Sequence, residues 1–408
     1  MKALSRNVVL LGVVSLLADI SSDMVMPLLP AFLVTLGAGA SFLGVIEGAA
    51  EATAALLKYL SGRWADRVRK LRPLALIGYA LAGFARPFLS VAQAPWQVLL
   101  IRNVDRVGKG VRTSPRDKLL AASTEPSRLA EAFAFHRGMD HAGAAVGPLV
   151  AAALLLAWPG RVRLVFLLAA IPGALAVLAL LAVREEEALA AGPGVPGVHP
   201  VHIPAAASAE PDVPGVHPVH RPLPESARIP PSLLAAIALF TLGNSTDALL
   251  VLRAQTLGVP TGQLPLLWAL LHVVRSLLSW PLGRAADRFG RRAALAAGWV
   301  WYAVCYAGFA AAHAPWQVWG LFGAYGLVAA LTEGTERALI AASVPVERRG
   351  RALGVYNLVS GVGLLAASVL AGAIWDRASP QAALLLGAAL ATAAAVVLAA
   401  APRTAGQA

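Results

Sequence analysis

Twelve long apolar stretches follow one another along this chain, and no other feature of the sequence constrains its fold as strongly. A helix needs about 20 apolar residues to cross the hydrocarbon core of a bilayer. With 58% hydrophobic and 14% charged residues, the chain is too apolar for an ordinary soluble protein. We therefore predict an all-α membrane protein with twelve transmembrane helices. The predicted spans are residues 7–35, 41–61, 73–92, 95–122, 129–157, 162–183, 231–256, 261–282, 293–312, 315–342, 350–375 and 381–400.

The two halves of the chain repeat each other. The pentapeptide Ala-Pro-Trp-Gln-Val occurs at residues 94–98 and again at 314–318, and the same offset relates Leu119 to Leu339. Between the halves, residues 185–230 are rich in Pro, Ala and Gly, which is typical of an exposed linker. The four histidines of this segment would suit a soft metal ion, but nothing there sets a ligand geometry, so a tolerant linker is the favoured interpretation. The predicted domains are a six-helix bundle at 1–184, a cytoplasmic linker at 185–230 and a second six-helix bundle at 231–408.

Basic residues outside the spans gather in alternate connections. The second, eighth and tenth connections are rich in Arg and Lys, and they lie on the same side as Lys2 and Arg6. The positive-inside rule places that side in the cytoplasm. We therefore predict a multi-pass protein of the cell (inner) membrane, monomeric in the lipid bilayer, with both termini cytoplasmic. The net charge of +12 reflects this bias and does not indicate nucleic-acid binding.

A stripe of charge runs along the fourth predicted span. At about 100° per residue, the seven charged residues from Arg102 to Asp117 fall on one arc of roughly 140°, and apolar residues occupy most of the rest. A cytoplasmic amphipathic loop is the alternative, but such a loop would need no counterpart in the second half. A charge near the middle of a bilayer is costly unless it faces protein or water, so the stripe indicates a functional site. Guanidinium groups bind carboxylate or phosphate in a bidentate manner, which favours an anionic or zwitterionic substrate. The candidate substrate-binding residues of the stripe are Arg102, Arg106, Lys109 and Arg112.

Acidic residues and a histidine lie within or beside this stripe in the first half. A carboxylate buried in a membrane can load and release a proton, and a nearby cation favours its charged form, so the carboxylate and an anionic solute compete for that cation. The alternative is that the acids only neutralise the stripe in fixed pairs, because buried charges are normally paired. The candidate proton-coupling residues are Asp19, Asp23, Glu47, Glu51, Asp105, His136 and Asp140.

The second half is sparser in charge. Ser-Ser-Asp ending at Asp23 matches Ser-Thr-Asp ending at Asp247, so we expect these two carboxylates to face each other across a cavity. Spans three, six, nine and twelve are almost free of charge, with Arg86 as the exception, and we expect them to face lipid while the other eight surround the cavity. The candidate substrate-binding residues of this half are Asn244, Asp247, Tyr356 and Asn357.

The connections after the second and the eighth spans match each other. The first reads Gly-Arg-Trp-Ala-Asp-Arg from Gly62, and the second reads Gly-Arg-Ala-Ala-Asp-Arg-Phe-Gly-Arg-Arg from Gly283. Together with the two six-span halves and the linker, they resemble the major facilitator superfamily, although Arg69 stands where that family usually has a glycine. The resemblance covers essentially the whole chain and implies a central site lined by spans one, four, seven and ten. The gating residues that it implies are Gly62, Asp66, Arg67, Gly283, Asp287 and Arg288.

These patterns predict a secondary active transporter that moves a small solute by alternating access with proton coupling. Gly143, Gly147 and Pro148 in the fifth span look like the antiporter motif of the family, which favours export, and a plain packing role is equally open. We predict no enzymatic activity, no cofactor and no resident metal. A non-transporting membrane receptor is one alternative. The other is a divalent metal exporter, for which the candidate ligands are Asp19, Asp23, His136, Asp140 and His141.

Overall fold

In a computed structural model of the protein, every regular element of the described residues is a helix. The structure describes residues 4–65, 67–68, 70–124, 128–185, 229–344 and 349–401. The first half contains α1 (Arg6–Asp23), η1 (Met26–Leu28), α2 (Leu29–Thr35), α3 (Ala40–Ala65), α4 (Leu71–Ala85), η2 (Arg86–Val91), α5 (Pro95–Ala122), α6 (Leu129–Ala157), α7 (Val162–Leu168) and α8 (Ala170–Leu181). The second half contains α9 (Pro231–Gly243), α10 (Ala248–Thr256), η5 (Thr261–Gln263), α11 (Leu264–Phe289), α12 (Arg291–Ala311), α13 (Pro315–Ala342), α14 (Arg349–Arg377) and α15 (Pro380–Ala400).

Each predicted span coincides with one helix or with consecutive helices of this order. Within the described ranges, nine helical segments are long and apolar enough to cross a membrane. The remaining three predicted spans are the long helices α5, α11 and α13, and each of them contributes ionisable side chains to the cavity described below. The predicted all-α membrane fold is confirmed.

The repeated pentapeptide forms the same helix start in both halves. Pro95 and Pro315 occupy the first turn, where a missing N–H breaks no hydrogen bond. Gln97 Oε1 accepts from the backbone N–H of Ala94 at 3.1 Å, and Gln317 Oε1 accepts from that of Ala314 at 3.0 Å. The repeat is therefore a helix cap that begins α5 and α13 in the same way.

The first and seventh predicted spans each consist of consecutive helices with a break between them. The first span breaks after Asp23, just before Pro27, which has no N–H to donate. The seventh breaks between α9 and α10, where the N–H of Thr246 donates to Ser368 Oγ and that of Ala248 donates to Thr246 Oγ1. Hydroxyl groups thus replace helical carbonyl acceptors at this second break.

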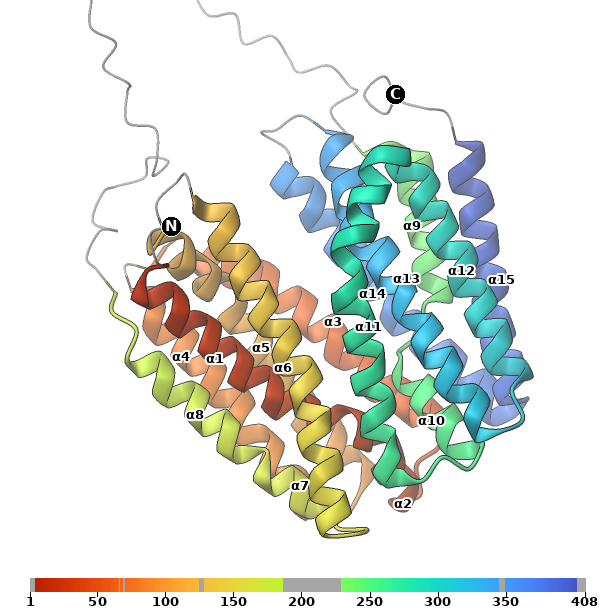
Figure 1. Ribbon diagram of the computed structural model, residues 1–408, viewed down its shortest axis with the longest axis horizontal. Coiled ribbons are helices and arrows are strands. Elements are labelled where there is room, and N and C mark those ends of the chain that lie inside the picture. Colours follow the sequence, from red (N-terminus) through yellow and green to blue (C-terminus); the bar gives the residue numbers. More distant parts are fainter. Residues whose placement is uncertain are drawn as a thin grey trace, which may run out of the picture.

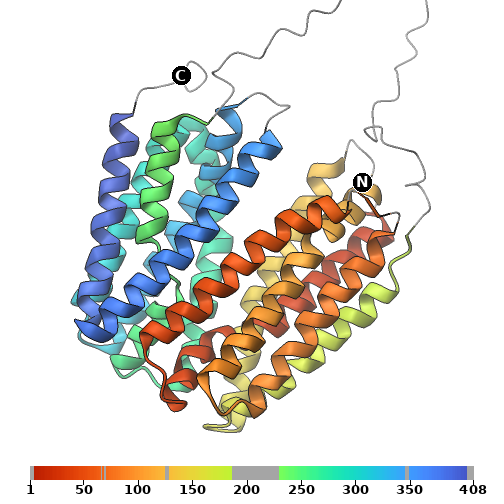
Figure 2. The ribbon, with the colours of Figure 1, turned by 180° about the vertical axis from the view of Figure 1, so that it is seen from behind.

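Figures 1 and 2 show the helices of the first half on one side of the molecule and those of the second half on the other, with the start of α1 and the end of α15 at the same end. The halves contact each other mainly where α3 lies along α14 and α6 along α11. At the end remote from the termini this contact is close, because a Cβ on Gly44 would lie 2.1 Å from the carbonyl oxygen of Ser368. At the end near the termini, a Cβ on Gly283, Gly334 or Gly354 would meet nothing within 4 Å.

The four spans that were expected to face lipid present apolar side chains outward. Phe84 of α4, Leu178 of α8, Val304 of α12 and Val396 of α15 are all exposed. The one ionic exception, Arg86, is turned inward and buried. These helices therefore form the outer wall of the two bundles.

Candidate functional site

A cavity of about 730 Å³ lies between the two halves. Its walls come from α1, α3, α5 and α6 on one side, and from the α9–α10 turn, α11, α13 and α14 on the other. Among the described residues, α4, α7, α8, α12 and α15 contribute nothing to its lining. The expectation that eight spans surround a cavity is confirmed, and the volume suits a small organic solute. The cavity extends from Met26 and Trp268 at its inner end to Lys58, Gly283 and Arg337 near the end that carries the termini.

Helix α5 turns most of its ionic stripe toward this cavity because two glycines pack its other sides. A Cβ on Gly108 would lie 2.5 Å from the carbonyl oxygen of Gly78 in α4, and one on Gly110 would lie 2.5 Å from Leu57 Cβ in α3. These close contacts leave room for no side chain there, so the glycines serve helix packing. The stripe residues that line the cavity are Arg106, Lys109, Arg112 and Arg116.

Arg102 and Asp105, the stripe residues closest to the start of α5, form a closed cluster of four charges with Glu47 and Arg86. Arg102 donates to Glu47 through two hydrogen bonds of 2.9 and 2.8 Å and forms an ion pair of 3.0 Å with Asp105. Asp105 also accepts from Arg86 Nε at 2.9 Å. All four side chains are buried, and their two positive and two negative charges cancel. Arg102 and Asp105 do not line the cavity, whereas Glu47 does.

Two further arginines of α5 face carboxylates across the cavity wall. Arg106 Nε lies 3.3 Å from Glu51 Oε1, and Arg112 lies 3.9 Å from Asp19 Oδ1. The Arg112 guanidinium also stacks over the ring of Tyr79, 4.2 Å from its centre. Both pairs are longer than the bonds of the closed cluster, so they leave donors available to a bound anion.

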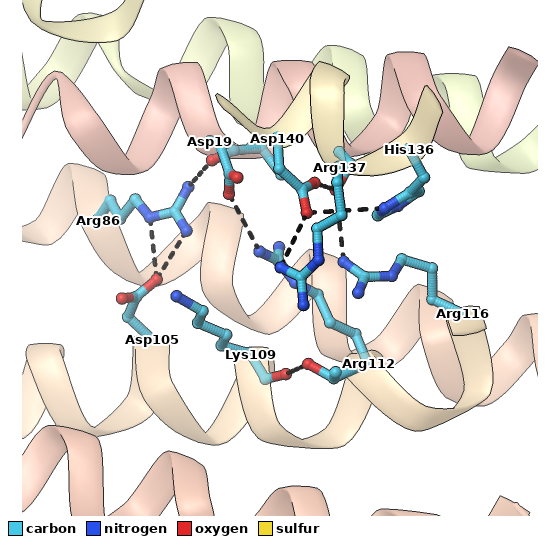
Figure 3. A network of polar contacts seen from close by, with 12 residues as sticks. Asp19, Arg86, Asp105, Lys109, Arg112, Arg116, His136, Arg137 and Asp140 are labelled. Atoms are coloured by element: carbon cyan, nitrogen blue, oxygen red, sulfur yellow. Dashed lines mark hydrogen bonds and ion pairs between the residues drawn. The ribbon is translucent and has the colours of Figure 1, made fainter. Parts of the chain in front are cut away.

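Lys109 lies between Arg106 and Arg112 along α5, and Figure 3 shows it between Asp105 and Arg112. Among the described residues, no carboxylate oxygen lies within 4.0 Å of its amine, and it lines the cavity. Asp23 also lines the cavity and accepts a hydrogen bond of 3.1 Å from the indole Nε1–H of Trp268. Lys109 therefore presents a positive charge that a solute can bind directly.

Asp140 of α6 is the centre of a second polar cluster (Figure 3). It accepts a short hydrogen bond from Ser15 Oγ, and its Oδ2 lies 3.6 Å from both His136 Nδ1 and Arg137. Ser15 Oγ also accepts from Arg116 at 3.4 Å, which links the cluster to α5. Asp140 lines the cavity, whereas His136 is buried behind it, with its Nε2 unpartnered in the described part of the chain.

The second half supplies a wall with fewer charges. Asp247 accepts a hydrogen bond of 2.7 Å from the Tyr325 hydroxyl, and Asn244 lies beside it on the cavity wall. Arg275 and Glu333 form an ion pair that also lines the cavity. The predicted pair of Asp23 and Asp247 thus lies on opposite walls of one cavity.

The structure places two other predicted substrate-binding residues outside the cavity lining. The Tyr356 hydroxyl is buried and donates to Glu336 at 2.6 Å, and Asn357 is exposed. Glu336 also accepts from Trp299 Nε1 at 3.1 Å. The polar pattern of this span could not distinguish a side chain that faces the cavity from one that packs beside it.

The predicted gating residues are only partly described. Gly283 lines the cavity near its open end, a Cβ on Gly62 would lie 3.6 Å from Ser114 Oγ, and Arg288 lies over the ring of Phe289. Arg67 is exposed. Asp66 and the side chain of Asp287 lie outside the described residues, as do residues 186–228 of the predicted linker. The gating role stays a prediction.

Sequence reasoning missed Trp268 and gave no role to the pair of Arg275 and Glu333. All three line the cavity. The pair of Arg275 and Glu333 could have been predicted as site residues, because both are ionisable and lie in predicted spans. Trp268 could not have been predicted, because a tryptophan in an apolar span is as typical of packing as of a binding site.

Comparisons with a family model and with a curated protein point to the same family. The family model of the Major Facilitator Superfamily matches residues 11–279 and again residues 232–407. An uncharacterized MFS-type transporter of Methanocaldococcus jannaschii is 28% identical over 396 residues, which is 96% of this chain and 93% of that protein.

Two solved structures share the fold at low sequence identity. The nucleoside transporter NupG superposes with a TM-score of 0.74 at 13% identity, covering 97% of this chain and 99% of that one. A bacterial homolog to the human lysosomal transporter Spinster, in an inward-facing and unoccupied conformation, superposes with a TM-score of 0.69 at 16% identity. That alignment covers 96% of this chain and 94% of the other.

Proposed function

Because the chain belongs to the Major Facilitator Superfamily and is a multi-pass membrane transporter, we propose that it carries a small anionic or zwitterionic solute by alternating access. The transport is coupled to protons. The protein lies in the cell (inner) membrane with both termini in the cytoplasm, so the conformation described here is open to the cytoplasm.

The charge of the first-half wall is the observation that carries this proposal. Six cations and five carboxylates of this half line the cavity, and one carboxylate, Glu47, is already bound to Arg102 in the closed cluster. Arg116 is likewise paired with Asp117, which does not line the cavity, so five cations remain for four carboxylates. Lys109 has no carboxylate partner in the described residues. The cations of this wall are Lys58, Arg106, Lys109, Arg112, Arg116 and Arg137.

The carboxylates of the same wall divide into two groups. Asp19, Asp23, Glu51 and Asp140 face the cavity, where water or solute reaches them, and we assign proton exchange to these four. Glu47 and Asp105 belong to the closed cluster, and His136 is buried outside that cluster. We assign a supporting role to these three residues. An anion that binds the arginines would weaken their hold on these four carboxylates and favour protonation, which couples the two movements.

Transport by purified protein in liposomes tests the proposal. A thermal-shift screen of organic anions and amino-acid-like zwitterions first identifies a solute that stabilises the protein. We then expect an imposed pH gradient to drive flux of the radiolabelled solute through the unaltered protein. Asp23→Asn should abolish this driven flux and spare solute exchange, because it removes a titratable group but leaves the cationic wall intact.

Asp117→Asn is the matched control, because Asp117 does not line the cavity and pairs with Arg116 at its edge. It should keep flux that follows the pH gradient. If Asp23→Asn also keeps such flux, the assignment of coupling to this carboxylate is wrong.

A further inference from the structure

Within the described residues, one hydrogen bond from a charged group of the cavity crosses between the two halves of the protein. The indole N–H of Trp268 in α11 donates a hydrogen bond of 3.1 Å to Oδ1 of Asp23, and Asp23 is the last residue of α1. Trp268 is 7% exposed, and its ring packs against that of His272 with centroids 5.5 Å apart. Among the described residues, no cation lies within 4.0 Å of the Asp23 carboxylate, so Trp268 is its direct partner there.

This contact lies at the boundary between the cavity and the seal of its closed end. Asp23 and Trp268 both line the cavity. Directly after Asp23 the first span breaks, and Met24, Val25 and Leu28 enter an apolar core that contains residues of both halves. η1 contacts α11 in this region. A change at Asp23 therefore acts where the two halves are held together.

Other buried carboxylates bind aromatic donors within their own half. Asp247 accepts from Tyr325, and Glu336 accepts from Trp299 and Tyr356. Asp23 differs from both, since its donor belongs to the opposite half. The symmetry-related carboxylates thus have different partners, and one of these partners can transmit a change between the bundles.

We propose that Trp268 is a positioning residue through which protonation of Asp23 releases the closed end of the cavity. The proposal rests on the proton coupling proposed above. A hydrogen bond to a carboxylate is roughly twice as strong as one between neutral groups. When Asp23 accepts a proton, the bond to Trp268 loses this strength, and the halves separate at the end remote from the termini.

Other charges near Asp23 set the conditions under which it accepts a proton. Lys109 and Arg106 of α5 and Arg86 of the third span act on it as positive neighbours, and Asp19 on its own helix is a negative one. A solute anion bound at Lys109 would offset the positive neighbours and favour the proton on Asp23. Solute binding and release of the closed end would then be linked through one carboxylate.

Distances between spin labels at the closed end test this proposal without any solute. Gln93 and His313 are exposed and precede the two copies of the repeated pentapeptide, so labels there report on equivalent points of the two halves. The labels are attached to cysteines in a Cys305→Ser background and measured by double electron–electron resonance in liposomes. In the unaltered protein, lowering the pH should shift the distance distribution toward longer values.

Trp268→Phe keeps an aromatic ring but removes the N–H donor. We expect about a tenfold shift toward the long-distance population at neutral pH and loss of the pH response, as for removal of one charge-assisted hydrogen bond. Asp23→Asn should have the same effect on the distances. It replaces Trp268→Phe in the measurement if Trp268→Phe folds poorly. Trp299→Phe is the matched control, because it removes an indole bond to Glu336 inside one half, and it should keep the unaltered response.

A normal pH response in Trp268→Phe or in Asp23→Asn would overturn the proposal. The same would follow if Trp299→Phe shifted the distances as much as Trp268→Phe does. Since the distances need no solute, a failure here is distinguishable from a failure of solute flux. If flux follows the pH gradient but the spin-label distances do not change with pH, the proposed function is supported and the role of the contact between Trp268 and Asp23 is contradicted.

Discussion

Neighbouring arginines of α5 have different surroundings, although they look alike in the sequence. Arg102 is held by two hydrogen bonds to Glu47 and does not line the cavity, whereas Arg106 and Arg112 face the cavity in longer pairs. A buried ion pair with good geometry is costly to break, because the remaining charge is left without a partner. We therefore expect Arg102 to support the fold and Arg106 and Arg112 to bind solute.

Stability measurements can separate these roles. Arg102→Met should destabilise the protein by about 3–5 kcal/mol, because it leaves Glu47 buried without a cation. Adding Glu47→Met should recover part of this loss, since no unpaired charge remains. Scanning fluorimetry in detergent measures the change in melting temperature. Arg137→Met is the control, because its side chain is 61% exposed, and a melting temperature lowered equally by this change would contradict the distinction.

The residues of the ionic stripe were predictable from the sequence, but their pairings were not. Helical periodicity places Arg102 and Arg106 on one face of α5. Which carboxylate each one meets depends on how α3 packs against α5, and periodicity within one helix contains no such information. The bond between Trp268 and Asp23 is a stronger example, because its residues lie on opposite halves of the chain.

At the scale of helices, small residues decide which surfaces meet. Gly108 and Gly110 let α4 and α3 approach α5 closely, and this packing turns Lys109 toward the cavity. Gly44 and Gly372 have the same role between α3 and α14 at the closed end. Helix packing in a membrane depends on such close contacts, because lipid tails are as apolar as the side chains that they replace.

Gly108→Ala tests this packing directly. Its new methyl group would lie 2.5 Å from the carbonyl oxygen of Gly78, so we expect a destabilisation of about 1–3 kcal/mol and a lower melting temperature. Gly138→Ala in α6 is the matched control, because a Cβ there meets nothing within 4 Å. The control should be neutral or slightly stabilising, as alanine favours a helix by up to about 1 kcal/mol. Equal melting temperatures for the two variants would refute the packing role.

Hydropathy predicted most helix positions within a few residues, although α11 continues to Phe289, and it did not indicate the breaks of the first and seventh spans. A window of apolar residues has the same mean value whether or not a turn interrupts it. The Pro27 break could have been anticipated from proline chemistry. The break before α10 could not, because the hydroxyl of Ser368 that accepts from Thr246 comes from another helix.

At the scale of the whole molecule, the two bundles are held together at one end and separated at the other. At the closed end, the Asp376 carboxylate of α14 accepts from the backbone N–H groups of Ala40 and Ser41 at the start of α3, at 3.0 and 2.8 Å. A negative charge at a helix N-terminus is a favourable interaction that joins the halves. Toward the other end, the helices of the two halves diverge (Figure 1), and α3, α5 and α6 on one side and α11 and α13 on the other line the cavity. This asymmetry is what alternating access requires of one of its two end states.

We infer that the stripe of α5 faces a water-filled cavity in the middle of the membrane. The most direct test is the reaction of single cysteines with a membrane-impermeant, charged thiol reagent in a Cys305→Ser background. Lys109→Cys should react rapidly, and Phe84→Cys on the outward face of α4, which is 71% exposed there, should not, because lipid covers it. If Lys109→Cys reacts no faster than Phe84→Cys, the stripe does not face water, and the proposed path for solute and protons is contradicted.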